Sequence, residues 1–78
     1  MKFALKILPK PEVLDTQGRA VESTLKHHGF AVNQCQVGKY IVLEVNSGNA
    51  EEAESMAKQM AEKGLYNPLI ENYQLERL

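Results

Sequence analysis

The chain has 78 residues, which is one domain at most, and a core built from so few residues is only marginally stable unless the chain oligomerises. The formal net charge is -1 and the lysines and arginines are scattered, which argues against nucleic acid as the main partner. No apolar run approaches the roughly 20 residues that span a bilayer. The N-terminal stretch, residues 1–12, is too short and too charged for a secretory signal peptide.

The first two predicted elements are a strand and a helix. Residues 2–8 alternate between apolar and polar side chains, which is the period of a half-buried strand, and two prolines then end it. Residues 16–28 are predicted to be helical, with Asp15 as the N-cap and Gly29 as the left-handed C-cap. Residues at steps of three and four predict one inward stripe: Leu14, Gly18, Val21, Leu25 and His28. Close approach to a sheet or a partner would explain Gly18, because glycine inside a helix costs about 1 kcal/mol relative to alanine.

Two further strands are predicted on either side of Gly38–Lys39, over residues 31–37 and 40–45. In this interpretation the pair forms a tight β-turn, with glycine supplying a positive φ. A two-residue loop pairs Val37 with Tyr40, whereas a three-residue loop or a bulge shifts that register by one residue. In both registers residues 40–45 carry apolar side chains on both faces of the strand.

The Gly38–Lys39 pair does not fit a nucleotide-binding loop. Such a loop requires the pattern G-x-x-x-x-G-K-[ST], but Asn33 stands where the first glycine belongs and Tyr40 where the hydroxyl belongs. The pair also precedes a strand, whereas a phosphate-binding loop opens a helix.

The last predicted elements are again a helix and a strand. Asn49 is the expected N-cap of the helix, with Glu52 three residues later as in a capping box. Gly64 ends the helix, Pro68 prevents it from resuming, and residues 69–75 are the expected last strand.

The predicted order β-α-β-β-α-β defines a single α+β domain over residues 1–78. Its natural packing is the ferredoxin-like arrangement, a four-stranded antiparallel sheet with both helices on one face. One layer of helices leaves the other face of the sheet uncovered. Apolar side chains on that face therefore predict a surface for a second copy or for another partner.

The sequence offers no self-contained catalytic constellation. His27 and His28 are adjacent on the predicted helix and point about 100° apart, so they cannot share a metal without strain. Cys35 lies within a predicted strand, where no helix N-terminus activates its thiol, and is interpreted as buried and structural. A single cysteine also fits a reducing cytoplasm. We therefore predict no catalytic, cofactor-binding or metal-ligating residue in this chain.

Three motifs, in this order and spacing, resemble the PurS family, the small subunit of phosphoribosylformylglycinamidine synthase in purine biosynthesis. They are LDTQG at Leu14–Gly18, VGK at Val37–Lys39 and NPLIENY at Asn67–Tyr73. The resemblance covers essentially the whole chain. One departure is Thr16, where the family pattern commonly has proline, and threonine still suits the first position of a helix.

The resemblance implies a non-catalytic assembly subunit. It would help join a glutaminase subunit to an ATP-dependent synthetase subunit, so that ammonia from glutamine converts formylglycinamide ribonucleotide to formylglycinamidine ribonucleotide. ATP, magnesium and glutamine would then be used by the partner subunits, and no cofactor by this chain. The family also implies a homo-oligomer, either a dimer or a tetramer, in the cytoplasm. The candidate contact residues are Lys10, Gly38, Lys39, Tyr40, Val42, Asn67 and Tyr73.

The strongest rival function is an ACT-like amino-acid-sensing domain, which shares the same order of elements. Such domains bind amino acids at a glycine-rich first loop, whereas the loop of residues 8–18 has prolines instead, which weakens that alternative. An acylphosphatase-like enzyme would need an arginine in that loop, which offers only Lys10. An RNA-binding domain of the RRM type would need aromatic platforms and a more basic surface.

Overall fold

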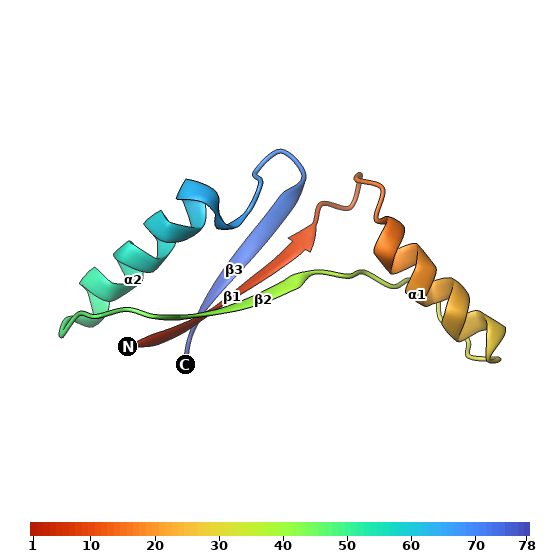
Figure 1. Cartoon of the computed structure of the whole chain (residues 1–78), viewed down its shortest axis with the longest axis horizontal. Coiled ribbons are helices and arrows are strands. Elements are labelled where there is room, and N and C mark those ends of the chain that lie inside the picture. The colour runs from red at the N-terminus through yellow and green to blue at the C-terminus, as the bar shows by residue number, and fades with distance from the viewer.

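The computed structural model describes residues 1–78 and contains three strands and two helices. In chain order these are β1 (Lys2–Pro9), α1 (Thr16–His27), β2 (Lys39–Glu44), α2 (Ala50–Met60) with a π-helical turn η1 (Ala61–Leu65), and β3 (Glu71–Arg77). The sheet has the order β2-β1-β3 and both pairings are antiparallel (Figure 1). The class is therefore α+β, as predicted, but the sheet has three strands and not four.

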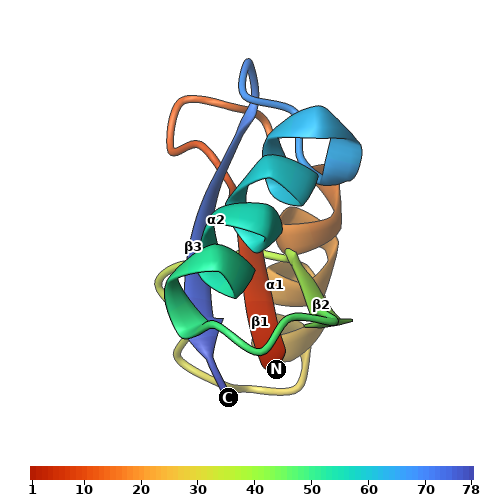
Figure 2. The same ribbon diagram turned by 90° about the vertical axis from the view of Figure 1, so that its left-hand side faces the viewer.

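The core lies between β1, the central strand, and α2. The predicted alternation along β1 is confirmed, because Phe3, Leu5 and Ile7 are all buried and pack with residues of α2 and η1. Helix α2 covers this face of the sheet (Figure 2). Three alanines of α2 and η1, Ala53, Ala57 and Ala61, allow the helix to approach the sheet closely, and Val45 is buried with them. Ala4 of β1 is buried as well. Small residues on one helix stripe thus position α2 over the middle of the sheet.

The predicted helix caps are confirmed. The Asp15 carboxylate accepts a hydrogen bond from the Gly18 backbone N–H at 2.8 Å, and the Asn49 side-chain oxygen accepts from two N–H groups in the first turn of α2. Gly29 has a φ of 88° and follows the C-cap residue His28 in a Schellman motif at the end of α1. The expected capping box is only half formed, because the Asn49 N–H donates to the Ser47 hydroxyl and not to Glu52.

The last helix stops at the predicted glycine, but the last strand begins later than predicted. The turn η1 runs to Leu65, yet Gly64 within it has non-helical backbone angles (φ 158°, ψ 4°). The final strand begins at Glu71, because Ile70 belongs to a turn in which its N–H donates to the Asn67 carbonyl at 3.1 Å.

Residues 31–37 do not form the predicted strand, and Gly38 does not turn the chain. The segment is extended but unpaired, and the chain passes from it straight into β2 (Figure 1). Gly38 has no positive φ, and its role is close approach, since an added Cβ would meet the Ile7 carbonyl oxygen. The hairpin is wrong because Lys39 is already paired with Ile7 of β1.

Helix α1 lies beyond the end of the sheet and not on its face (Figure 1). Residues 13–37, which we call the arm, project away from the rest of the chain, residues 1–12 and 38–78, which we call the body. The molecule measures 50 × 24 × 14 Å, with a radius of gyration of 15.7 Å. A compact domain of this length has a radius of gyration of about 11.5 Å. The predicted packing of both helices on one face is therefore wrong for this chain by itself.

The apolar stripe of α1 is largely open to solvent. Leu14 is 63% exposed and Val21 is 41% exposed, although both were expected to face inward. Gly18 is the buried residue of α1, and an added Cβ there would meet the Cys35 carbonyl oxygen and the Asp15 carboxylate. The expected close approach at Gly18 is thus confirmed, with the neighbouring half of the arm in place of a sheet.

Candidate subunit interface

The outer edge of β2 has no partner strand. Met1 and Val45 exchange both backbone hydrogen bonds, at 2.9 and 2.7 Å. Because these pairs alternate along an antiparallel ladder, the odd-numbered residues of β2 bond to β1. The N–H and C=O groups of Tyr40, Val42 and Glu44 therefore point to the free edge. An exposed edge of this kind is a template for another strand.

A groove lies beside α2, next to the free edge. Its volume is about 570 Å³, and four apolar side chains line it together with Gln59, Lys63 and Gly64: Leu43, Met56, Met60 and Leu65. Met60 is 39% exposed, whereas Met56 is partly buried against the core. In a ferredoxin-like fold the first helix packs beside the second, over this side of the sheet. Here α1 lies beyond the end of the sheet and does not cover the groove (Figure 1).

The sheet face opposite α2 is also partly apolar. Tyr40 is 60% exposed and Val42 is 52% exposed, while Ile41 and Leu43 on the same strand face α2. The prediction that this strand is apolar on both faces is confirmed. Lys6 lies on this face as well, in an ion pair with Glu76 at 2.7 Å that raises the lysine pKa.

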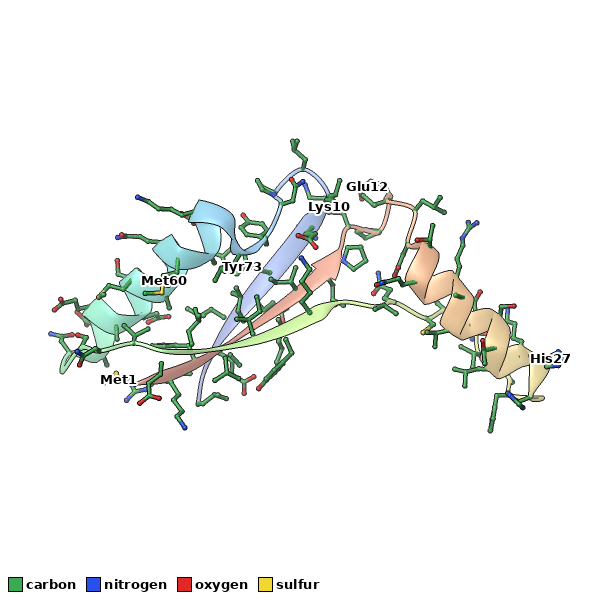
Figure 3. The ribbon with its side chains drawn as sticks, viewed as in Figure 1. Met1, Lys10, Glu12, His27, Met60 and Tyr73 are labelled. Atoms are coloured by element: carbon green, nitrogen blue, oxygen red, sulfur yellow. The ribbon has the colours of Figure 1, made fainter.

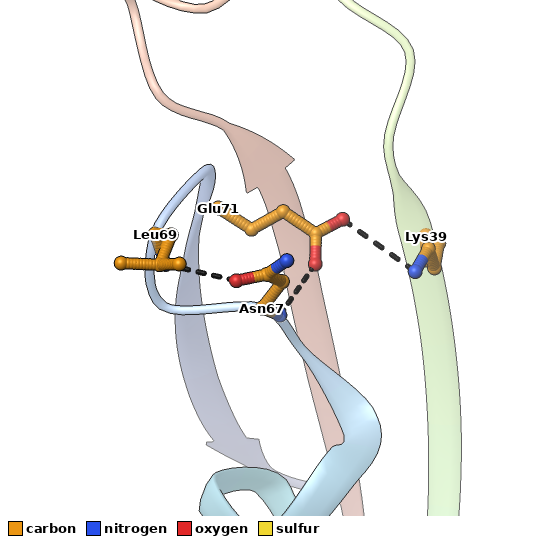
Figure 4. Close-up of polar contacts among 4 residues, drawn as sticks. All are labelled: Lys39, Asn67, Leu69 and Glu71. Carbon is orange, nitrogen blue, oxygen red and sulfur yellow. Dashed lines mark hydrogen bonds and ion pairs between the residues drawn. The ribbon is translucent and has the colours of Figure 1, made fainter.

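A loop at the end of the sheet joins two of the predicted contact residues through Glu71 (Figure 4). One oxygen of the Glu71 carboxylate accepts from the Asn67 N–H at 2.7 Å, and the other lies 3.5 Å from the Lys39 ammonium. The Asn67 side-chain oxygen accepts from the Leu69 N–H at 3.0 Å, which leaves the Leu69 side chain 81% exposed. Lys10 lies at the same end of the sheet (Figure 3), and its N–H donates to the Ile70 carbonyl at 2.8 Å.

Tyr73 lies apart from the uncovered face. Its ring packs against Tyr66 with centroids 4.6 Å apart, on the α2 side of the sheet, and its hydroxyl donates to Glu62 at 3.5 Å. Burial, and then the negative charge of Glu62, raise the pKa of Tyr73. The structure thus places Lys10, Lys39 and Asn67 at one end of the sheet, Tyr40 and Val42 on the open face, and Tyr73 against Tyr66 on the α2 side. The exposed Leu69 was missed, because it was predicted to begin a strand.

The remaining reactive side chains are scattered. Cys35 is half-buried in the arm and not in a strand, contrary to expectation. His27 lies at the far end of α1, exposed, next to His28 (Figure 3). No three His, Cys, Asp or Glu side chains gather where they could hold a metal ion. Neither helix is long and apolar enough to cross a membrane.

The geometry defines a small α+β protein with a three-stranded sheet, a free edge at β2 and a first helix beyond the end of the sheet. The family model PurS, described as phosphoribosylformylglycinamidine (FGAM) synthase, matches residues 2–78. The PurS subunit of this synthase from Thermotoga maritima is 35% identical over 78 residues, which cover 99% of this chain and 95% of that protein. The Bacillus subtilis PurS subunit is 37% identical over 96% of this chain and 89% of its own length.

Solved structures agree with these sequence comparisons. The crystal structure of the Thermotoga maritima PurS subunit has a TM-score of 0.93, with 99% of this chain and 90% of that chain covered at 35% identity. Thermus thermophilus PurS has a TM-score of 0.85 at 40% identity, with 99% and 95% covered. A chain in the structure of PurLQS from Thermotoga maritima has a TM-score of 0.92 at 35% identity, again with 99% and 95% covered. The chain therefore belongs to the PurS family of phosphoribosylformylglycinamidine synthase, and the amino-acid-sensing alternative is left without support.

Proposed function

We propose that this chain is the non-catalytic assembly subunit of phosphoribosylformylglycinamidine synthase. It would hold a glutaminase subunit and an ATP-dependent synthetase subunit together, so that ammonia released from glutamine reaches formylglycinamide ribonucleotide. The partner subunits would use ATP, magnesium and glutamine, in the cytoplasm, where a single unpaired cysteine suits the reducing conditions. The likeness to a chain of PurLQS from Thermotoga maritima supports this role.

The observation that carries the proposal is the amount of surface that the fold leaves uncovered. The chain exposes 5775 Å². A compact monomer of 8.8 kDa is expected to expose about 4,800 Å², so roughly 1,000 Å² is in excess. A standard protein–protein interface buries about 800 Å² on each partner. The excess is therefore large enough for one stable interface, and ten large apolar side chains are among those that the fold leaves exposed.

We infer that one partner is a second copy of the chain. The arm carries the two structures that the body lacks, a helix with an apolar stripe and an extended segment. The extended segment 31–37 of a second copy would pair with the free edge of β2, and its α1 would fill the groove beside α2. Leu14, Val21 and Leu25 would then meet the apolar lining of that groove. Because both copies offer the same surfaces, the contact is two-fold and closes on itself.

The surface that remains after this pairing is proposed to contact the larger subunits. Tyr40 and Val42 stay uncovered on the sheet face opposite α2. The loop with Asn67 and the exposed Leu69 stands at the end of the sheet, beside Lys10 and Lys39. An apolar patch with a polar rim is the usual composition of a protein–protein contact.

Reconstitution tests this role. The chain is mixed with the glutaminase and synthetase subunits, magnesium, ATP and formylglycinamide ribonucleotide, and amidine formation is measured with glutamine or with ammonium chloride. Omitting the chain is expected to abolish the glutamine-dependent reaction and to spare the ammonium-dependent one. Val42→Glu is expected to act like omission, whereas Ser55→Glu, on the exposed side of α2, leaves the activity unchanged. Full glutamine-dependent activity without the chain would show that the assembly role is wrong.

A further inference from the structure

The three strands are those of a ferredoxin-like sheet from which one edge strand is missing. In that fold the first, third and fourth strands lie in the order that β1, β2 and β3 have here, and the second strand pairs with the outer edge of the third. That outer edge is the free edge of β2. Residues 31–37 could reach it within the same chain only by turning back at Gly38–Lys39. The arm can therefore pack against its own body or against the body of another copy.

The side-chain contacts of the arm do not distinguish these two arrangements. The same side chains would meet across the groove and the edge whether the arm belonged to the same chain or to a second one. Association between chains also costs translational and rotational freedom, which folding back does not. A closed monomer is therefore favoured unless the connection between arm and body opposes it. This is the energetic balance of domain swapping, in which the hinge decides the outcome.

The arm joins the body at residues 37–39, which we call the hinge. Its first residue, Val37, is held by a hydrogen bond within the arm. The Asp15 carboxylate bridges two backbone donors: one oxygen accepts from Gly18 N–H at 2.8 Å, and the other accepts from Val37 N–H at 2.9 Å. In a two-residue hairpin over Gly38 and Lys39, Val37 N–H would have to donate to the carbonyl of Tyr40, which points to the free edge. In the structure the Val37 N–H already donates to Asp15, so it cannot form the hairpin bond.

Two further contacts keep the hinge extended. Gly38 lies against the Ile7 carbonyl, where only a residue without a side chain fits, and Lys39 is already paired with Ile7. Lys39 also reaches Glu71 of β3 at 3.5 Å. Folding the arm back would break the Asp15–Val37 bond and remove Lys39 from its ladder position. The sequence nevertheless retains a glycine at the first central position that a type II′ turn requires.

We propose that Asp15 is a latch that keeps the arm open, so that the chain exchanges arms with a second copy instead of closing into a four-stranded monomer. This inference rests on the proposed homo-oligomer, and it assigns to Asp15 a positioning role that helix capping alone does not require. Asn49 caps α2 in the same way, but its side chain bonds only within its own helix turn. The chain therefore contains a matched control.

Single substitutions distinguish the Asp15 hydrogen bond to Val37 from its helix-capping bond to Gly18. Asp15→Asn keeps an oxygen for Gly18 N–H but turns an amide N–H group toward Val37, and Asp15→Ser keeps one cap oxygen without the second acceptor. Asn49→Ser makes a comparable change in the other helix. The double variant Gly38→Asn with Lys39→Gly supplies the turn residues of a type I′ hairpin and adds a Cβ that the open hinge cannot accommodate.

Light scattering after gel filtration gives the mass, and small-angle scattering gives the radius of gyration. The unmodified chain and Asn49→Ser are expected at twice 8.8 kDa. Both Asp15 variants are expected to raise the dissociation constant of the dimer by about tenfold or more. The double hinge variant is expected to be a monomer with a radius of gyration near 12 Å. Circular dichroism checks that each variant is folded, and if the double variant is not, the Asp15 variants decide alone.

The outcomes distinguish this inference from the proposed oligomer. If the unmodified chain is a dimer and the folded Asp15 variants dimerise equally well, the latch is wrong and the oligomer stands. If the unmodified chain is a monomer with a radius of gyration near 15.7 Å, the oligomer is wrong. The latch is then supported only if Asp15→Asn lowers that radius toward 12 Å and is otherwise overturned. A monomer near 12 Å without any substitution overturns both.

Discussion

The body and the arm use similar sequences in opposite ways. Both contain a capped helix with an apolar stripe, yet every buried hydrophobic side chain of the molecule belongs to the body, and the buried residue of the arm is Gly18. The body buries its stripe because alanines let α2 lie close to the sheet. The arm exposes its stripe because α1 lies beyond the sheet (Figure 1). An apolar helix face therefore indicates that something covers it, but not whether that cover lies in the same chain.

The largest expected difference between the two regions concerns leucine side chains. Leu5→Ala in the body should lower the free energy of unfolding by about 2–5 kcal/mol, because Leu5 is fully buried and the change leaves a cavity. Leu14→Ala in the arm should change it by less than about 0.5 kcal/mol in dilute solution, because Leu14 is 63% exposed. Urea unfolding measures both. At high protein concentration Leu14→Ala should become more destabilising if a second copy covers the arm. Equal losses in the free energy of unfolding for the two variants in dilute solution would show that the arm is buried as the body is.

The hinge between the regions gives the next largest effect. Gly38→Ala should lower the free energy of unfolding by roughly 1–3 kcal/mol, because the new methyl group meets the backbone carbonyl of Ile7 and cannot be relieved by a rotamer change. Gly48→Ala is the control, since nothing lies within 4 Å of a Cβ at that position. Thermal unfolding of both variants checks this expectation. A neutral Gly38→Ala would mean that the hinge has room to move.

The connection between arm and body should also depend on pH. Hydrogen bonds from Gly18 N–H, and then from Val37 N–H, lower the pKa of Asp15 below its unfolded value of 3.8. The contribution of Asp15 to stability is therefore complete above pH 3.8 and is lost as pH falls through the lower, folded-state pKa. The difference in Tm between the unmodified chain and Asp15→Asn should be constant from pH 7 to about pH 5 and should shrink below pH 3.8. A difference that grew on acidification would have the wrong sign.

Surface ion pairs should give the smallest difference between the regions. Lys6 and Glu76 in the body lie 2.7 Å apart, and Lys26 and Glu22 in the arm lie 3.7 Å apart. Pairs exposed to water are screened, so Lys6→Ala and Lys26→Ala should shift Tm only slightly, and the shift should vanish near 1 M salt, where the Debye length is about 3 Å. A large, salt-independent shift for Lys6→Ala would indicate that its face of the sheet is covered in solution.

Local sequence signals predicted local structure well. The caps at Asp15, Gly29 and Asn49 are present, because each depends on hydrogen bonds or a φ angle within a few residues. The two apolar faces of β2 followed from alternation alone. The predicted contact residues lie in three separate places, the open face, the loop and the α2 side of the sheet. Their grouping depends on strand order and on loop hydrogen bonds such as that between Glu71 and Asn67.

Strand pairing could not be read from the sequence. Residues 31–37 have strand composition, and Gly38 followed by Lys39 has turn composition, so a hairpin was the natural prediction. The structure keeps this stretch straight, because Gly38 packs against Ile7 and Asp15 bonds to Val37 across 22 positions of sequence. Both contacts join residues that are distant along the chain, which periodicity and propensity do not record.

The sequence by itself determined which segments are helical or extended, where the helices begin and end, and, through three motifs, membership of the PurS family. Those properties depend on interactions within a few residues or on patterns retained in relatives. Only the tertiary structure decided that the first helix leaves its own sheet and that one edge of β2 stays free. The reason is that an apolar stripe specifies burial without specifying a partner, and the contacts that hold Val37 and Gly38 join residues that are distant along the chain.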